Sequence, residues 1–309
     1  MDKNDKIYIA GHTGLIGSAI VNQLRHFGFN NLVFREKREL NLINSADTDI
    51  FFKQNNPDYV ILAAGKTSGI SGNIKFPADL IYENTLIETN IIQCSHKYGV
   101  KKLLYFGCSC MYPKYCKQPM KEDYLFSGKL ESTSEHYAIA KLVGLKMCQA
   151  YNKEYKTNFL TVIPSNVYGI NDRFDGKGHV IPDMIKIFHE AKNQNKKNVT
   201  LSGSGKPLRD FIFADDVAEI CISILNSNVS HEIINIGSGK GISIKKLSKM
   251  IKEVTGFKGK ITFDKTRPDG MMEKILDNTR IKKIGLTPKT SLEEGIILAY
   301  NSYLKTPAK

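Results

Sequence analysis

The chain has 309 residues, of which 41% are hydrophobic and 24% are charged, and this composition excludes a disordered or fibrous protein. Six cysteines, a short polar N-terminus and the lack of an apolar run of membrane-spanning length predict a cytoplasmic protein with free thiols, not a secreted or membrane-embedded one. The net charge of +13 is spread along the whole chain without a basic helix or a zinc-finger spacing, which favours a lysine-rich solvated surface over a nucleic-acid interface.

The first half of the chain alternates short apolar runs with helix-length amphipathic segments, which is typical of βαβ units around a parallel sheet. The apolar runs predict strands that begin at Ile7, Asn31, Tyr59, Lys102 and Asn158. The segments between them predict helices over residues 14–27, 45–55, 78–98 and 134–154.

These elements predict an α/β fold with two unequal parts. Residues 1–165 should form a Rossmann-type doubly wound parallel sheet, and residues 166–309 a smaller, mostly C-terminal α/β substrate-binding lobe. Segments near residues 211–236 again read as sheet and helix, so we expect them to return to the Rossmann domain.

A glycine-rich turn, GHTGLIG, follows the first predicted strand and opens the first helix. Gly11, Gly14 and Gly17 allow a tight turn, and the helix N-terminus at Leu15 and Ile16 can receive a pyrophosphate. A merely tight strand-to-helix connection is the alternative, but the context of the motif favours a dinucleotide.

The residues after the second strand select the dinucleotide. An NAD-binding protein usually offers a carboxylate to the ribose there, whereas this chain has Arg35, with Lys37 and Arg38 close by. These cations predict a 2′-phosphate and hence NADP(H), and Glu36 is the residue that argues against it.

The helices over 78–98 and 134–154 carry apolar residues on more than one face. We interpret this as packing against the sheet on one side and against a partner subunit on the other, which predicts a homodimer. A deeply covered monomer is the alternative.

Tyr137 and Lys141 are four residues apart in YAIAK, which places them on one face of the last of these helices. An ammonium beside a phenol lowers the pKa of the phenol, so we expect Tyr137 to exchange protons near neutral pH. This spacing alone is commonly structural, and its place downstream of the glycine turn favours catalysis.

Several strings together resemble the GDP-L-fucose synthase family, the GDP-4-keto-6-deoxy-mannose 3,5-epimerase-4-reductases of the extended short-chain dehydrogenase/reductase superfamily. The resemblance covers nearly the whole chain, from AGHTGLIGSAI to SLEEGI. The strings are CSCMYPKYCKQPMKEDYL, ESTSEHYAIAKLVGLKMCQAYN, PSNVYG, GHVIP, FHEA, GSGKPLRDFIFADD and RPDG.

The resemblance implies a two-stage reaction on a GDP-linked keto sugar. A base and an acid invert C3 and C5, which the 4-keto group acidifies, and NADPH then reduces C4. The family's cysteine and histidine match Cys110 and His179, which join Tyr137 and Lys141 as implied catalytic residues.

The resemblance also implies sets of binding residues. Cofactor contacts fall on Asn41, Leu42, Ala63, Ala64, Lys141, Pro164, Asn166, Val167 and His179, in addition to the glycine turn and Arg35. Substrate contacts fall on Ser109, Lys186, Arg209 and Arg267.

The chain departs from the family at the serine that hydrogen-bonds the keto oxygen, because Cys108 occupies that place. Ser109 is adjacent but should point the other way if the segment is a strand. Ser202 and Ile187 depart too, where the family often has Trp and a basic residue. A metal site built from Cys108, Cys110 and Cys116 fits no zinc spacing, so we predict no metal.

Two other functions remain open at this point. One is a single-activity reductase or epimerase on a related GDP-4-keto sugar such as a heptose. The other is a nucleotide-binding regulator on an inactive scaffold, against which the joint presence of Tyr137, Lys141, Cys110 and His179 argues.

Overall fold

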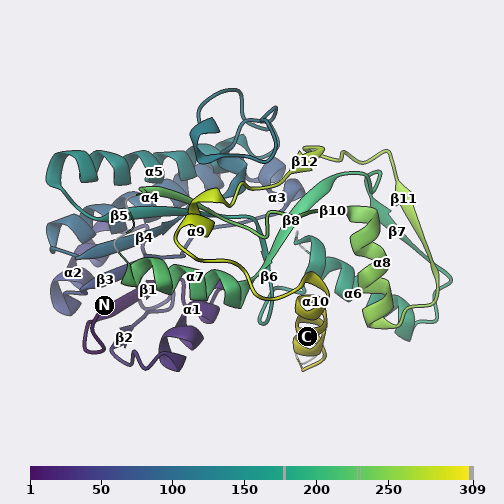
Figure 1. The fold of residues 1–309 in the computed structure, drawn as a ribbon, viewed down its shortest axis with the longest axis horizontal. Helices are drawn as coiled ribbons and strands as arrows, with labels where there is room; N and C mark the ends of the chain where they lie inside the picture. The colour runs from purple at the N-terminus through teal and green to yellow at the C-terminus, as the bar shows by residue number, and fades with distance from the viewer. Residues whose placement is uncertain (177–178, 228, 230, 306–309) are drawn as a thin grey trace.

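The computed structural model describes residues 1–176, 179–227, 229 and 231–305, and its two lobes lie side by side along the longest axis of the molecule (Figure 1). Gly178, the first residue of the GHVIP string, and the last four residues of the chain lie outside the described residues. No described helix is long and apolar enough to cross a bilayer.

The large lobe is built on a six-stranded sheet in which every pair of neighbouring strands is parallel. Its strands are buried on both faces and are apolar almost throughout, as a sheet covered by helices on both sides requires. In spatial order they are β2 (Leu32–Val33), β1 (Ile7–Ala10), β3 (Tyr59–Leu62), β4 (Lys102–Phe106), β5 (Phe159–Pro164) and β9 (Ile233–Ile236).

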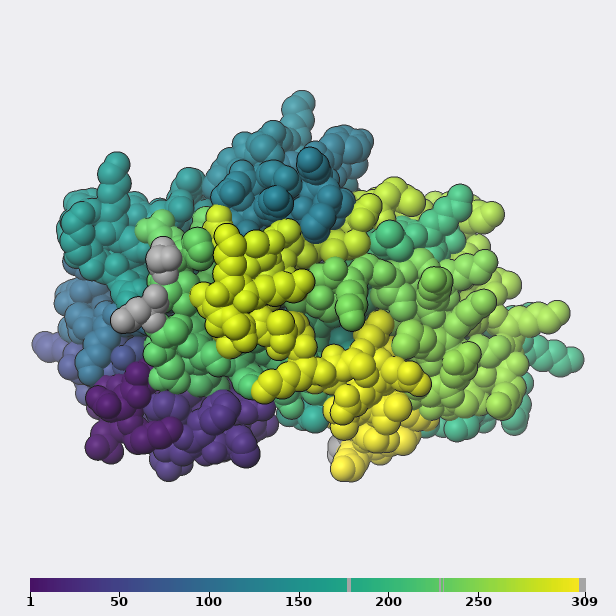
Figure 2. All heavy atoms as spheres, viewed as in Figure 1, coloured from purple at the N-terminus to yellow at the C-terminus, as the bar shows by residue number. Residues whose placement is uncertain are grey.

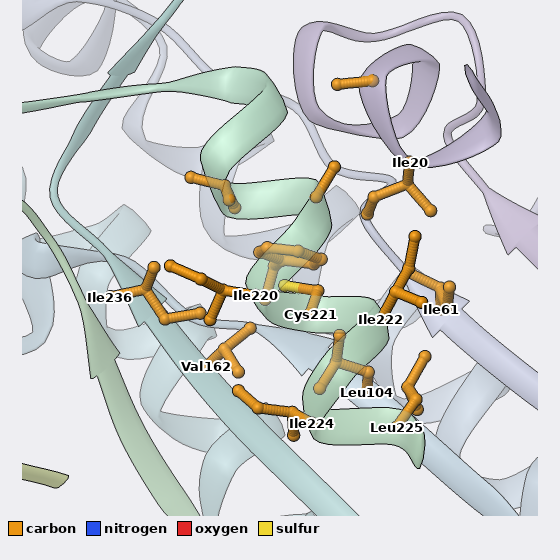
Figure 3. Close-up of a cluster of buried hydrophobic side chains, with 14 of the residues drawn as sticks. Ile20, Ile61, Leu104, Val162, Ile220, Cys221, Ile222, Ile224, Leu225 and Ile236 are labelled. Atoms are coloured by element: carbon orange, nitrogen blue, oxygen red, sulfur yellow. The ribbon is translucent and has the colours of Figure 1, made fainter. Parts of the chain in front are cut away.

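Helices cover both faces of this sheet. One face carries α2 (Ser45–Asn55), α4 (Pro77–Lys97) and α5 (Glu135–Tyr155), and α4 packs along α5. The other face carries α1 (Leu15–His26) and α7 (Ala214–Asn226), which pack on each other. Figure 3 shows this second layer, with Ile220 and Ile224 of α7 beside Val162 of β5.

The strand order determines where a ligand can bind. β1 has β2 on one side and β3 on the other, so the chain leaves the carboxyl ends of β1 and β3 in opposite directions. A crevice opens at such a switch point, and ligands of open α/β sheets bind there. The glycine turn after β1 and the segment after β3 both border this crevice.

The small lobe has its own core beneath three helices, α6 (Val180–Asn193), α8 (Ile244–Thr255) and α10 (Leu292–Lys305). One of its sheets has β8 (Leu208–Phe213) beside β6 (Asn166–Tyr168), β10 (Gly241–Ser243) and β12 (Glu273–Lys274), and the other pairs β7 (Asn198–Ser202) with β11 (Lys260–Asp264). The shorter helices are α3 (Ile70–Lys75), α9 (Thr279–Lys283), η1 (Ser109–Met111) and η2 (Glu122–Tyr124).

The chain passes between the lobes more than once. β8 ends at Phe213 in the small sheet, after which α7 and β9 join the large lobe. The C-terminal part then crosses back, and Figure 2 shows α9 lying over the large lobe and α10 against the small one. The predicted α/β fold with a Rossmann-type sheet is confirmed, although β2 is only two residues long.

Candidate active site

A cleft of about 430 Å³ lies at the predicted switch point. Its walls come from the glycine turn, from the ends of β3, β4 and β5, and from the start of α6. The cleft is lined by Gly14, Leu15, Ile16, Gly17, Ala63, Cys108, Ser109, Tyr137, Pro164, Asn166, Val167, Asp172 and His179, among others. A hollow of about 490 Å³ between α1 and α7 holds none of the predicted residues.

The glycine turn brings the backbone to the cleft. Gly11 has φ +88°, and a Cβ there would lie 2.7 Å from the Ala64 nitrogen. A Cβ on Gly17 would collide with the carbonyl of Gly11. Both positions therefore require glycine, and the N-terminus of α1 faces the cleft with its amide groups, which is the arrangement that binds a pyrophosphate.

The surroundings of this turn fit a dinucleotide phosphate. His12 Nδ1 is buried without a hydrogen-bond partner among the described residues. After β2, Glu36 forms an ion pair with Arg38, at 2.8 Å, whereas Arg35 is exposed and donates to the carbonyl of Phe34 at 2.8 Å. The carboxylate of Glu36 is thus paired with Arg38, and the guanidinium of Arg35 remains exposed for a 2′-phosphate.

Tyr137 and Lys141 both start from the first turns of α5, but Lys141 does not act on Tyr137 as the sequence predicted. Its Nζ lies 6.0 Å from the centre of the Tyr137 ring and forms an ion pair of 2.9 Å with Glu88, a residue of α4. Burial is the largest cause that raises the pKa of Tyr137 well above its usual value, and the neighbouring Cys108, Cys110 and Glu88 add to it. The expected lowering was wrong because burial dominates and because the charge of Lys141 is already paired with Glu88.

Cys108 and Cys110 flank the first residue of η1, a 3-10 turn that follows β4. Their thiols are hydrogen-bonded, and that bond from Cys108 is the largest cause that lowers the pKa of Cys110 well below its usual value. Lys274 of β12 adds to it, with Nζ 3.4 Å from the Cys110 sulfur. Burial raises the pKa of Cys108, which stays a neutral thiol beside the Tyr137 hydroxyl.

Ser109 does not point away from the cleft, as it would if the segment were a strand. Because the chain turns into η1 at this point, the alternation of a strand does not apply, and Ser109 lines the same cleft as Cys108. A backbone that curls at the end of β4 therefore presents both residues to one ligand.

His179 stands at the N-cap of α6, across the cleft from these residues. Its Nδ1 lies 3.3 Å from Oδ1 of Asp172, whose side chain is only 2% exposed. That hydrogen bond is the main cause that raises the pKa of His179. The carboxylate thus fixes the imidazole and favours its protonated, proton-donating form near neutral pH.

The predicted substrate cations lie outside the lining of this cleft. Arg209 of β8 donates to the carbonyls of Leu208, at 2.9 Å, and Asp269, at 3.2 Å, and its charge acts on Cys110. Arg267 is largely exposed and pairs loosely with Asp264 at 3.8 Å. Lys186 is half-buried on α6.

Some predicted cofactor residues also lie outside the cleft lining. Asn41 and Leu42 form a turn in front of α2, where the carbonyl of Leu42 accepts from the Asn90 side chain at 2.9 Å. Ala64 backs the glycine turn, and Lys141 lies behind Tyr137.

Within the described residues, no three or more His, Cys, Asp or Glu side chains are grouped to hold a metal ion, and all six cysteines are free. Sequence reasoning missed Glu88, Lys274 and Asp172. Only Glu88 had a local signal, as a polar residue on the face of α4 that also buries Leu80 and Ile91.

Comparison with known proteins agrees with this geometry. Residues 7–237 match the model of the NAD dependent epimerase/dehydratase family. The chain is 46% identical over 305 residues to GDP-L-fucose synthase 1 of Arabidopsis thaliana, covering 98% of this chain and 94% of the relative. It is 43% identical over 312 residues to GDP-L-fucose synthase of Escherichia coli strain K12, covering 97% of each.

A solved structure matches equally completely. The GDP-mannoheptose C4 reductase from Campylobacter jejuni with NADP bound superposes with a TM-score of 0.92 at 38% sequence identity, covering 99% of this chain and 100% of the reductase.

Proposed function

The chain belongs to the NAD dependent epimerase/dehydratase family and, within it, to the GDP-L-fucose synthases, and from this premise we propose that it converts GDP-4-keto-6-deoxy-mannose to GDP-L-fucose, or to a close relative, with NADPH. The observation that supports this most is that the cleft carries a phosphate-binding turn, a half-buried tyrosine and a histidine held by a carboxylate, and that Cys110, whose thiolate is favoured, directly follows the lining residues Cys108 and Ser109.

Inversion at C3 and C5 needs a base on one face of the sugar and an acid on the other. Cys110 is the base, because the Cys108 hydrogen bond and Lys274 favour its thiolate. His179 is the acid, because Asp172 holds its Nδ1 and leaves Nε2 for the sugar.

Reduction at C4 needs a proton for the carbonyl oxygen. Tyr137 donates it, since its raised pKa keeps the phenol protonated, and Cys108 and Ser109 line the cleft beside it to hold the oxygen. When bound, NADPH supplies the hydride for C4. The glycine turn and the N-terminus of α1 would hold its pyrophosphate, and Arg35 its 2′-phosphate.

The cofactor assignment predicts that the enzyme prefers NADPH to NADH and that Arg35→Asp narrows or reverses this preference, because a carboxylate repels the 2′-phosphate and can accept from a ribose hydroxyl. The ratio of kcat/KM for the two cofactors measures it. Lys53→Asp, which changes an exposed cation of α2, is the control and should leave the ratio unchanged. Equal use of both cofactors by the parent enzyme would contradict the assignment.

Incubation with GDP-4-keto-6-deoxy-mannose and NADPH in D₂O tests the function itself. We expect NADPH oxidation together with deuterium at C3 and C5 of the product. A product reduced without deuterium would replace the proposal by a reductase alone, and no turnover of either kind would overturn it.

A second candidate is a single-activity C4 reductase on a GDP-linked heptose. Two observations favour it: the close superposition on the GDP-mannoheptose C4 reductase, and Cys108 in the place of the family serine. A faster turnover of a GDP-4-keto-heptose without deuterium uptake would select it.

We also propose a homodimer through α4 and α5. Ile139 and Val143 of α5 and Tyr82 of α4 are exposed by 36%, 38% and 63%, and form an apolar strip on two adjacent helices. Light scattering at micromolar concentration should give twice the mass of the chain, and Val143→Glu should give the single mass, whereas a monomeric parent would contradict the dimer.

A further inference from the structure

Glu88 is a fully buried carboxylate that the proposed mechanism leaves without a role. It lies in the middle of α4, its side chain is 0% exposed, and its Oε1 lies 2.9 Å from Nζ of Lys141. Lys141 is itself only 5% exposed, and its Nζ also donates to the carbonyl of Phe106 at 3.1 Å. A buried carboxylate is costly, and an apolar residue would pack here with less penalty.

The carboxylate of Glu88 lies against α5 where Gly144 leaves room for it. A Cβ on Gly144, one turn after Lys141, would lie 2.7 Å from Oε2 of Glu88 and 2.6 Å from the hydroxyl of Tyr105. That hydroxyl donates to the carbonyl of Lys141 at 3.0 Å. Glu88 thus holds the lysine side chain while Tyr105 holds its backbone, so the lysine is fixed at both ends.

The protonation state of Tyr137 depends on all the groups packed around it. These groups are Lys141 of α5, Glu88 of α4, Tyr105 of β4, Cys108 and Cys110 of the turn after β4, and Lys274 of β12. Lys141 is the cation that would favour a tyrosinate, and Glu88 is the group paired with it. Burial raises the pKa of Glu88, which its contact with Lys141 opposes.

We propose that Glu88 is a positioning residue that pins Lys141 and offsets its charge, so that Tyr137 stays in the protonated form that a reductase needs. An enzyme that begins by oxidising an alcohol needs the tyrosinate as its base, whereas one that reduces a ketone needs the phenol as its acid. Glu88 therefore biases this site towards reduction. The inference rests on the proposed reduction at C4 and on Tyr137 as its proton donor.

The test is the pH dependence of reduction in Glu88→Gln. The rate falls as the pH rises through the value at which Tyr137 loses its proton, because only the phenol donates. Removing the carboxylate leaves Lys141 uncompensated, so this alkaline limb should move down by about one pH unit or more. Deuterium exchange, which does not use Tyr137, should keep its own pH profile.

Glu122→Gln is the matched control. Glu122 is also a buried carboxylate paired with a cation, but that cation is Arg280 of α9, at 3.4 Å, and not Lys141. The substitution Glu122→Gln should lower thermal stability and leave the alkaline limb of the reduction rate at the same pH. Glu88→Asp provides a second reading if Glu88→Gln does not fold, since its shorter carboxylate should move the limb in the same direction by less.

The outcomes separate this inference from the proposed function. If the parent enzyme reduces the keto sugar but the limb stays fixed in the Glu88 variants, Glu88 has only a structural role and the inference fails. If the parent enzyme does not reduce the keto sugar at all, the proposed function fails first. A limb that moves equally in Glu122→Gln would also overturn the inference.

Discussion

Tyr137→Phe should reduce the rate of reduction by roughly 10²–10⁴-fold, the usual contribution of a positioned acid. The ring is kept, so packing in the cleft changes little, while the only proton donor assigned to the keto oxygen is lost. NADPH binding should stay nearly the same, because the substitution leaves the proposed cofactor contacts, the glycine turn and Arg35, unchanged. NADPH oxidation with the keto sugar measures the first effect and a fluorescence titration with NADPH the second.

Cys108→Ser is the matched control, because it changes the group beside the Tyr137 hydroxyl and keeps the phenol. A hydroxyl is the stronger hydrogen-bond donor to a developing alkoxide, so reduction should be maintained or should increase. Full reductase activity in Tyr137→Phe would remove the tyrosine from the mechanism. Loss of reduction in Cys108→Ser would mean that the thiol has a function that a hydroxyl cannot replace.

The parts of the fold that could be predicted are those that short segments specify. The seven residues of the glycine turn are enough to identify it, and the predicted strand before it and helix after it are both present. The helices predicted over 45–55 and 134–154 agree with α2 and α5 to within one residue. β2 came out shorter because its pairing with β1 covers only two residues.

The parts of the site that could not be predicted depend on contacts between distant segments. Lys274 reaches Cys110 across 164 residues, through a strand of the small lobe, and nothing near either residue indicates the other. Asp172 is closer to His179 in the sequence, but no helix or strand spacing links the two residues, so the contact had no local signal. Such pairs arise from the topology, which positions β12 and α6 at the ends of β4 and β5.

The error about Tyr137 has the same origin. The four-residue spacing of YAIAK correctly puts a lysine near a tyrosine, and from that alone a lowered pKa follows. The sign reverses because burial of the phenol raises its pKa and because Glu88, from another helix, pairs with the lysine. A local motif thus gives the members of a site, whereas its electrostatics depend on every element packed against it.

Cys110→Ser should suppress deuterium incorporation at C3 and C5 by roughly 10²–10⁴-fold, since a general base is lost and an alcohol is far less ionised than a thiol near neutral pH. Cys108 and Lys274 favour the thiolate of Cys110, whereas a serine hydroxyl at the same place remains protonated beside the same two groups. Reduction should survive, because Tyr137 and the cofactor turn are untouched, and the product should be the unepimerised sugar.

Lys274→Met tests the same role of Cys110 in a second way, because it removes the cation but keeps the thiol. Exchange should then persist with its profile moved to higher pH, where Cys110 ionises without the help of the cation, and high pH should restore much of the lost rate. Exchange that is unchanged in Cys110→Ser would instead show that another group abstracts the protons, and the epimerase assignment of Cys110 would fail. If exchange and reduction fall together, the substitution has disturbed the binding of the sugar, and the separation of the two steps between Cys110 and Tyr137 would not hold.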